Sequence, residues 1–168
     1  MPLVQLKDLP GSARTWVFGA NKTLDGPASE TLLAEADRFL SQWKAHGSPL
    51  TVARDWRYSR FLTVAVDQST AGASGCSIDG LFRSLTALEP KLGASLVTSG
   101  LVFYRDQTGA IQSVDREGFS ALGAKGKIES GTKVFDPTIT TLDEWRVRFE
   151  LDASQSWHAG LLPDKQPV

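Results

Sequence analysis

The sequence predicts an α+β fold, with a ferredoxin-like βαββαβ sandwich over residues 1–100 and a small α+β extension over residues 101–168. Strand-type and helix-type patterns alternate through the first hundred residues in that order. Two of the strand patterns are separated by a very short turn, and both helix patterns are amphipathic. Together these observations predict a sheet with two helices on one face.

The first elements follow from turn residues and periodicity. Residues 1–12 contain Pro2, Pro10 and Gly11, which predicts an extended arm, and residues 14–19 form a first strand pattern. Asp25-Gly26-Pro27 is typical of a helix start. The helical spacing of apolar residues that follows involves Leu32, Leu33, Ala36, Phe39, Leu40 and Trp43. We expect this helix to end at His46-Gly47, before Pro49.

The next elements are a hairpin and a second helix. Residues 50–56 and 60–66 are strand patterns joined through Arg57-Tyr58-Ser59. A second apolar helix face consists of Ile78, Leu81, Phe82, Leu85, Leu88 and Leu92. Gly93 predicts the end of this helix, and Pro90 is expected to end or kink its last turn. Residues 100–105 are the expected fourth strand.

The C-terminal third begins with a turn at residues 104–109, a short strand at 110–114 and a helix capped by Asp115. The pattern Glu117-x-Phe119-x-x-Leu122-x-x-x-Gly126-x-Ile128, followed by Thr132-x-Val134-Phe135, resembles the second class of GYF-like modules over about residues 103–146. Relatives of those modules bind proline-rich peptides. The Gly-Pro-Phe-type signature of their peptide groove is missing, and Trp145 also fits a packed core residue.

Composition excludes several classes of function. The net charge is -1 and the 18 basic residues are scattered, so we expect no nucleic-acid partner. One cysteine cannot form an internal disulfide, and the first residues lack the pattern of a signal peptide. No apolar run approaches the ~20 residues that span a bilayer. We therefore expect a cytoplasmic protein without membrane contact.

The loop from Asp67 to Asp79 is the candidate site. It lies between a strand and a helix, and small residues there would let the backbone approach an anion at the helix start. The candidate ligand-binding residues are Ser69, Thr70, Gly72, Ser74, Gly75 and Ser77. In the structural alternative, Ser74 or Ser77 only caps the helix, and Asp79 complements its dipole.

Thiol chemistry is a second interpretation of this loop. Cys76 would be the nucleophile, with its thiolate favoured by the helix start, His46 the base and Asp67 the residue that orients the histidine. The βαββαβ order places all three residues at one end of the sheet. The alternatives are a buried structural cysteine and a histidine that only ends a helix.

A third interpretation is an interaction protein. The arm before Gly11, the tail around Pro163 and the five tryptophans offer contact surfaces, although most of the tryptophans fit core positions. Trp157-His158 could fold over the site as a lid or dock for stability. No spacing of histidines and cysteines predicts a metal, and no motif predicts a cofactor.

The whole chain resembles a bacterial family of uncharacterised proteins that shares three segments with it. They are Trp-Lys-Ala-His-Gly at 43–47, Ala-Gly-Ala-Ser-Gly-Cys-Ser-Ile-Asp at 71–79 and Ser-Trp-His at 156–158. Some members carry the label of an ABC transporter ATPase. The phosphate-binding loop of such enzymes has the pattern Gly-x-x-x-x-Gly-Lys-Ser/Thr. Residues 72–77 have another spacing and no lysine, so the motifs do not support that label.

The sequence therefore favours a non-enzymatic domain that binds a small anionic ligand or a protein partner through the Gly72–Ile78 loop. The alternative is a cysteine-dependent enzyme with Cys76 as nucleophile and His46 as base.

Overall fold

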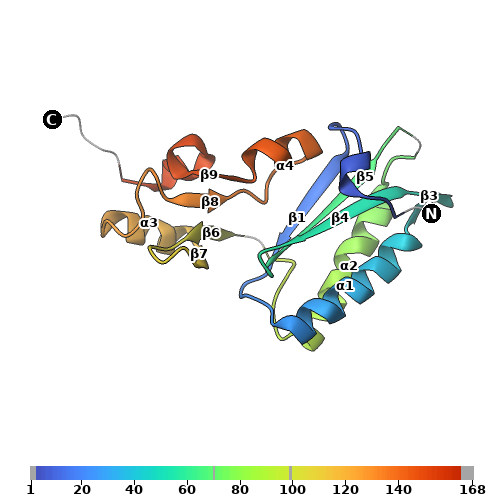
Figure 1. Ribbon diagram of the computed structural model, residues 1–168, viewed down its shortest axis with the longest axis horizontal. Helices are drawn as coiled ribbons and strands as arrows, with labels where there is room; N and C mark the ends of the chain where they lie inside the picture. Colours follow the sequence, from blue (N-terminus) through green and yellow to red (C-terminus); the bar gives the residue numbers. More distant parts are fainter. Residues whose placement is uncertain (1–2, 70, 99, 164–168) are drawn as a thin grey trace. The chain divides into compact units, whose positions relative to one another are not determined.

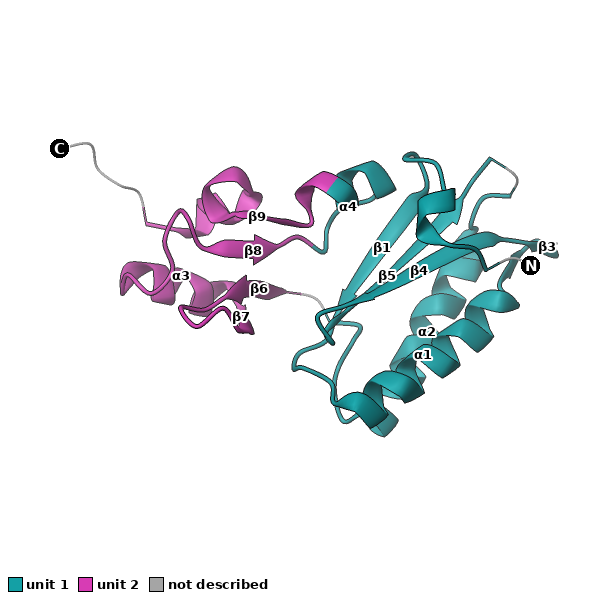
Figure 2. Cartoon of the chain, viewed as in Figure 1, with its two compact units in different colours: residues 1–98, 137–146 teal, residues 99–136, 147–168 magenta. Residues whose placement is uncertain are grey.

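The computed structural model describes residues 3–69, 71–98 and 100–163. The chain is a mixed α+β protein with antiparallel sheets, and it divides into two compact units (Figure 2). Unit 1 comprises residues Met1–Thr98 and Pro137–Arg146, and unit 2 comprises Ser99–Asp136 and Val147–Val168. Residues 137–146, which we expected in the C-terminal extension, thus belong to unit 1.

Unit 1 is a sheet covered by two helices. Its strands run in the order β1-β5-β4, each antiparallel to its neighbour. Figure 1 shows α1 and α2 side by side on one face of this sheet. The elements are η1 (Leu6–Asp8), β1 (Arg14–Gly19), α1 (Gly26–Ser41), β2 (Lys44–Ala45), β3 (Ser48–Pro49), β4 (Thr51–Arg57), β5 (Phe61–Asp67), α2 (Gly75–Leu92) and most of α4 (Leu142–Arg148).

The start of α1 is confirmed and its predicted end is wrong. Asp25 caps the helix by accepting a 2.8 Å hydrogen bond from the amide of Ala28. The helix ends at Ser41, and the chain then forms the small hairpin β2–β3. His46 and Gly47 occupy its turn with φ of 51° and 79°. Positive φ at both central residues is the conformation that two-residue hairpins require, and this explains the glycine.

The β4–β5 hairpin and α2 agree with the sequence. Tyr58 and Ser59 make the tight turn between the strands, with φ of 59° and 53°. α2 ends at Gly93, which adopts the left-handed conformation with φ of 65°. Pro90 does not end the helix, which continues to Leu92.

The fourth strand forms, but the prediction that it joins the sheet of unit 1 is wrong. β6 (Leu101–Arg105) forms where predicted, but it pairs with β7 (Ile111–Asp115) and β8 (Lys133–Phe135). Partners nearby in the chain cost less loop entropy than β1, which is more than eighty residues away, and this accounts for the choice. The free edge of β1 instead meets residues 140 and 141: Thr15 donates a 2.9 Å amide hydrogen bond to the carbonyl of Thr140.

The N-terminal arm is packed, contrary to the expectation of an open contact surface. Leu3 bridges to Val52 beside β4, and the amide of Val4 donates a 2.7 Å hydrogen bond to the Val52 carbonyl. Leu9 is only 5% exposed. This segment therefore covers an edge of the sheet, which would otherwise be open to pairing with other chains.

Unit 2 contains a second antiparallel sheet, in the order β7-β6-β8-β9. Asp115 caps α3 as predicted, with a 2.6 Å hydrogen bond from the amide of Gly118. Phe119 on α3 packs in the core of this unit with Tyr104 and Val134. The remaining elements are α3 (Arg116–Ala124), β9 (Glu150–Asp152), η2 (Ala153–Gln155) and η3 (Trp157–Leu161).

Two aromatic segments prove to be structural. Trp145 in unit 1 is 6% exposed, which confirms it as a packed residue. His158 is fully buried in unit 2, with the Trp157 ring stacked on it at 3.9 Å between centroids. The tail therefore docks within its own unit and supplies no open lid. None of the described helices is long and apolar enough to cross a membrane.

Candidate functional site

The candidate loop connects β5 to α2 at the end of unit 1 that also holds the β2–β3 hairpin. Asp67, the last residue of β5, pairs with Thr51, the first residue of β4. Trp43, just after α1, donates a 2.8 Å hydrogen bond from its indole nitrogen to the carbonyl of Ser77 in the first turn of α2. The expected meeting of the end of α1 with the start of α2 is thus present.

Ser74 and Ser77 form a reciprocal cap. The hydroxyl of Ser74 accepts from the amide of Ser77 at 3.2 Å, and the hydroxyl of Ser77 accepts from the amide of Ser74 at 2.7 Å. The Ser77 hydroxyl also donates to the carbonyl of Ser74 at 2.8 Å. Both hydroxyls are therefore occupied in fixing the helix start, as in the structural alternative.

Asp67 is engaged by its own loop. Its carboxylate accepts hydrogen bonds from the hydroxyl of Ser69 at 2.7 Å and from the amide of Ser69 at 2.9 Å. These bonds stabilise the charged form and hold the pKa of Asp67 below its ordinary value. Among the described residues, no hydrogen bond joins Asp67 to His46.

Cys76 and His46 are both exposed. Cys76 is the second residue of α2, and its thiol is open to solvent. His46 lies at the turn of the β2–β3 hairpin with a backbone held at positive φ. Within the described part of the chain neither side chain makes a hydrogen bond, so the structure displays no assembled nucleophile–base pair.

The backbone amides of the loop are the open donors. A helix start leaves its first amides without intrahelical partners. The cap satisfies the amide of Ser77, and that of Ile78 bonds to the Ser74 carbonyl at 2.9 Å. Those of Gly75 and Cys76 have no acceptor among the described residues. Thr70, also a candidate ligand-binding residue, lies outside the described residues.

The two glycines leave space around these amides. A side chain at Gly72 or at Gly75 would meet no atom within 4 Å, and neither backbone has a positive φ. Their conformations therefore do not demand glycine. The surface over the start of α2 is open on this side, where a ligand could approach the amides of Gly75 and Cys76.

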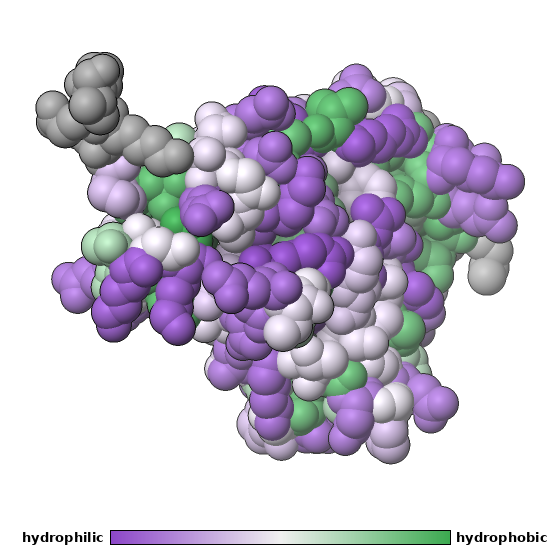
Figure 3. Space-filling model, turned by 60° about the vertical axis from the view of Figure 1, so that its left-hand side comes forward, coloured by the Kyte–Doolittle hydropathy of each residue, from purple (hydrophilic) through white to green (hydrophobic). Residues whose placement is uncertain are grey.

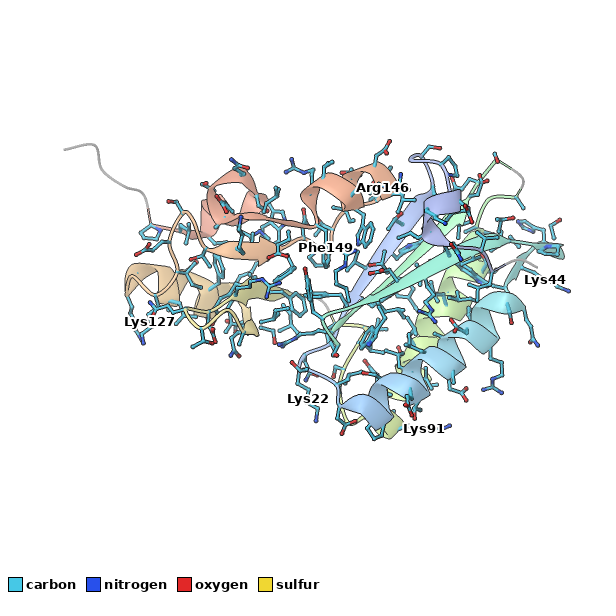
Figure 4. All side chains as sticks on the ribbon, viewed as in Figure 1. Lys22, Lys44, Lys91, Lys127, Arg146 and Phe149 are labelled. Carbon is cyan, nitrogen blue, oxygen red and sulfur yellow. The ribbon has the colours of Figure 1, made fainter. Side chains whose placement is uncertain are left out.

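Sequence reasoning missed two residues at this end of unit 1. Trp43 was assigned to a helix face, whereas its indole fixes the first turn of α2. Lys44 lies in β2, which contacts α2, and its side chain is exposed (Figure 4). The signal for both is the Trp-Lys-Ala-His-Gly segment at 43–47, which contains them beside His46 and Gly47.

The assembled site can offer two amide donors and the positive end of an 18-residue helix. That chemistry suits an anion. The residues that the structure describes contain no cluster of three histidine, cysteine or acidic side chains able to hold a metal ion. No family model matches the chain, and neither a curated protein nor a solved structure matches it.

Proposed function

We propose that this chain is a non-enzymatic binding protein that takes a small anionic ligand at the Gly72–Ile78 loop. The observation that carries the proposal is the pair of amides of Gly75 and Cys76, which are exposed and lack acceptors among the described residues. The Ser74–Ser77 cap and the Trp43 indole hold the loop before any ligand arrives. A preformed site loses little entropy on binding.

Charge supports an anion at this position. The aligned peptide dipoles of α2 place partial positive charge at Gly75 and Cys76. Lys44 is an exposed basic residue of β2, a strand that contacts α2. The carboxylate of Asp67, at the start of the loop, is occupied by Ser69. A phosphate, a sulfate or a carboxylate group, free or on a protein partner, has the chemistry to accept both amides.

Gly75→Pro is the sharpest test. Proline is favoured at the first helical position, where its missing amide removes one donor without breaking the helix. Ser74 has the extended conformation that a residue before proline needs, with φ of −92° and ψ of 166°. The matched control is Gly72→Ala, which adds a methyl group in open space and removes no donor.

In the parent protein, titration with sodium phosphate should move the amide NMR resonances of Gly75 and Cys76. The loss of one hydrogen bond to a charged group should weaken this binding about tenfold in Gly75→Pro and leave it unchanged in Gly72→Ala. Equal phosphate affinities in the proline variant and the parent, or no shift at these amides, would contradict the proposal.

A cysteine-dependent reaction is the second candidate, and the exposed thiol of Cys76 favours it. His46→Asn keeps the positive-φ turn, because asparagine tolerates that conformation, while it removes the imidazole. If His46 activates Cys76, iodoacetamide should alkylate the parent protein faster than this variant at pH 7. Equal rates, no faster than those of a free thiol, would exclude the catalytic role.

We also propose two assignments of fold. The order β1-β5-β4 with α1 and α2 on one face is that of three ferredoxin-like strands, and residues 140–141 lie at the edge where the fourth would pair. This supports a ferredoxin-like origin for unit 1. For the C-terminal part, the resemblance to GYF-like modules stays a prediction, and residues 137–146 of the resembling range belong to unit 1.

A further inference from the structure

Unit 2 carries two adjoining hollows that the sequence did not indicate. The first has a volume of about 250 Å³, and its lining includes Tyr104, Leu122, Ile128 and Lys127. The second, of about 440 Å³, also borders on Lys127 and continues toward Lys133. Asp106 and Gln107 line both, so the two hollows share a wall. Figure 3 shows apolar surface between hydrophilic side chains on the left of the view.

One wall is a rigid turn. The carboxylate of Asp106 accepts two hydrogen bonds from Thr108, from its hydroxyl at 2.6 Å and from its backbone amide at 2.9 Å. It also accepts from the backbone amide of Ala110 at 3.1 Å and from the side-chain amide of Gln112 at 3.0 Å. These bonds lower the pKa of Asp106 to about 2, so the carboxylate stays charged and committed to the turn. Asp106 therefore shapes the hollow while its oxygens are already occupied.

Another wall follows the end of α3. The amides of Lys127 and Ile128 donate to the carbonyl of Leu122 at 2.9 and 3.4 Å, after Gly126 turns the chain with φ of 76°. This geometry places the buried side chain of Ile128, 2% exposed, beside Leu122 in the floor. It leaves Lys127 exposed at the α3 end of unit 2 (Figure 4).

Two polar groups at the first hollow have no partner among the described residues. The ring of Tyr104 is buried in the core of unit 2 against Phe119, yet its hydroxyl has no hydrogen-bond partner among the described residues. The ammonium group of Lys127 likewise makes no ion pair with any described residue. Both groups donate hydrogen bonds, and both adjoin an apolar floor.

From this arrangement we propose that unit 2 binds a small hydrophobic carboxylate, with its hydrocarbon part on Tyr104, Leu122 and Ile128 and its acid group on Lys127. A ring or a branched chain matches the apolar floor, and a carboxylate can accept from the ammonium and the phenol together. Burial and the negative charge that Asp106 keeps both raise the pKa of Tyr104, so the phenol stays protonated and able to donate. This site is independent of the one proposed at α2, and either can fail without the other.

The test uses phenylacetate as the probe, with phenethylamine as its cationic counterpart and benzyl alcohol as its neutral one. In the full chain, phenylacetate should shift the amide NMR resonances of Leu122, Lys127 and Ile128 and bind most tightly of the three. Equal affinity for all three compounds, or an absence of shifts at these residues, would overturn the proposal.

Two variants separate the contacts. Lys127→Met keeps the aliphatic stem and removes the charge, and it should weaken phenylacetate binding at least about tenfold without affecting benzyl alcohol. Tyr104→Phe should weaken it about two- to tenfold and still fold, because the hydroxyl has no described partner. Lys125→Met is the matched control, since Lys125 is exposed nearby but does not line the hollow. An effect of Lys125→Met equal to that of Lys127→Met would reduce the site to nonspecific attraction and refute it.

Discussion

The indole nitrogen of Trp43 donates a buried 2.8 Å hydrogen bond to the carbonyl of Ser77, thirty-four residues further along the chain. This bond joins the segment after α1 to the first turn of α2. It therefore positions the amides of Gly75 and Cys76 relative to the β2–β3 hairpin. The candidate site depends on this long-range contact as much as on its own loop.

Trp43→Phe should destabilise the protein by about 1–2 kcal/mol. The substitution removes the donor to Ser77 and leaves a small gap at a position that is 4% exposed. Trp56→Phe makes the same chemical change at a half-buried tryptophan with no hydrogen bond to a described residue, and it should cost less. Urea denaturation measures both free energies of unfolding; equal losses would show that the indole hydrogen bond contributes nothing.

The reciprocal cap of α2 gives a second prediction. Ser74→Ala and Ser77→Ala should each lower the free energy of unfolding by about 1 kcal/mol, because each leaves a helix-start amide without its acceptor. The double variant should lose less than the sum, since the two serines bond to each other. Ser12→Ala, at an exposed serine without a described partner, is the control. Strict additivity in thermal or urea unfolding would contradict the reciprocal cap.

Local chemistry was predictable from the sequence. The caps at Asp25 and Asp115 and the left-handed end at Gly93 each depend on a few adjacent residues, and the structure has them. The turn at Tyr58-Ser59 follows from two strand patterns too close to be joined otherwise. The sequence also indicates a cap by Ser74 or Ser77 as the structural alternative for the candidate loop, and the structure has both serines in it.

What depends on distant pairing was not predictable. The pattern of residues 100–105 fits a strand of the unit 1 sheet as well as one of the unit 2 sheet. Which sheet the strand joins depends on the strands available to pair with it, and in the structure these are β7 and β8. His46-Gly47 suits a helix end as well as a hairpin turn, because both use positive φ. The Trp43–Ser77 bond and the hollow beside Lys127 arise from tertiary packing, which leaves no periodic signal.

The β4–β5 turn offers a stabilising substitution. Ser59 holds φ of 53°, a conformation that is unfavourable for residues with a Cβ. Ser59→Gly should raise the free energy of unfolding by about 0.5–1 kcal/mol. The relief of backbone strain in the folded state stabilises the protein, and the greater conformational entropy of glycine in the unfolded chain offsets part of that gain. Gly109→Ala is the reverse substitution, because it places a Cβ on a residue with φ of 87°, and it should lower the free energy of unfolding. Melting temperatures check both, and a lower one for Ser59→Gly would refute the strain.

Buried His158 should make the stability of the protein fall in mild acid. Its side chain is fully buried, and burial lowers its pKa from 6.5 to about 4, so the fold holds the neutral imidazole. The carboxylate of Asp136 raises this pKa and the guanidinium of Arg116 lowers it further. Nδ1 pairs with the hydroxyl of Ser156 at 2.7 Å, whereas Nε2 has no described partner.

The sign follows from the unfolded state. As the pH falls below 6.5, the unfolded chain takes up a proton that the fold refuses until about pH 4, so stability declines across that window and then levels off. At about 1.4 kcal/mol per pK unit the loss attributable to His158 is about 3 kcal/mol. The double variant His158→Phe with Ser156→Ala should lack this part of the decline in urea denaturation at pH 7 and pH 4.5. His46→Asn, at the exposed histidine, should keep it; if the double variant and the parent decline equally, His158 is not the titrating group.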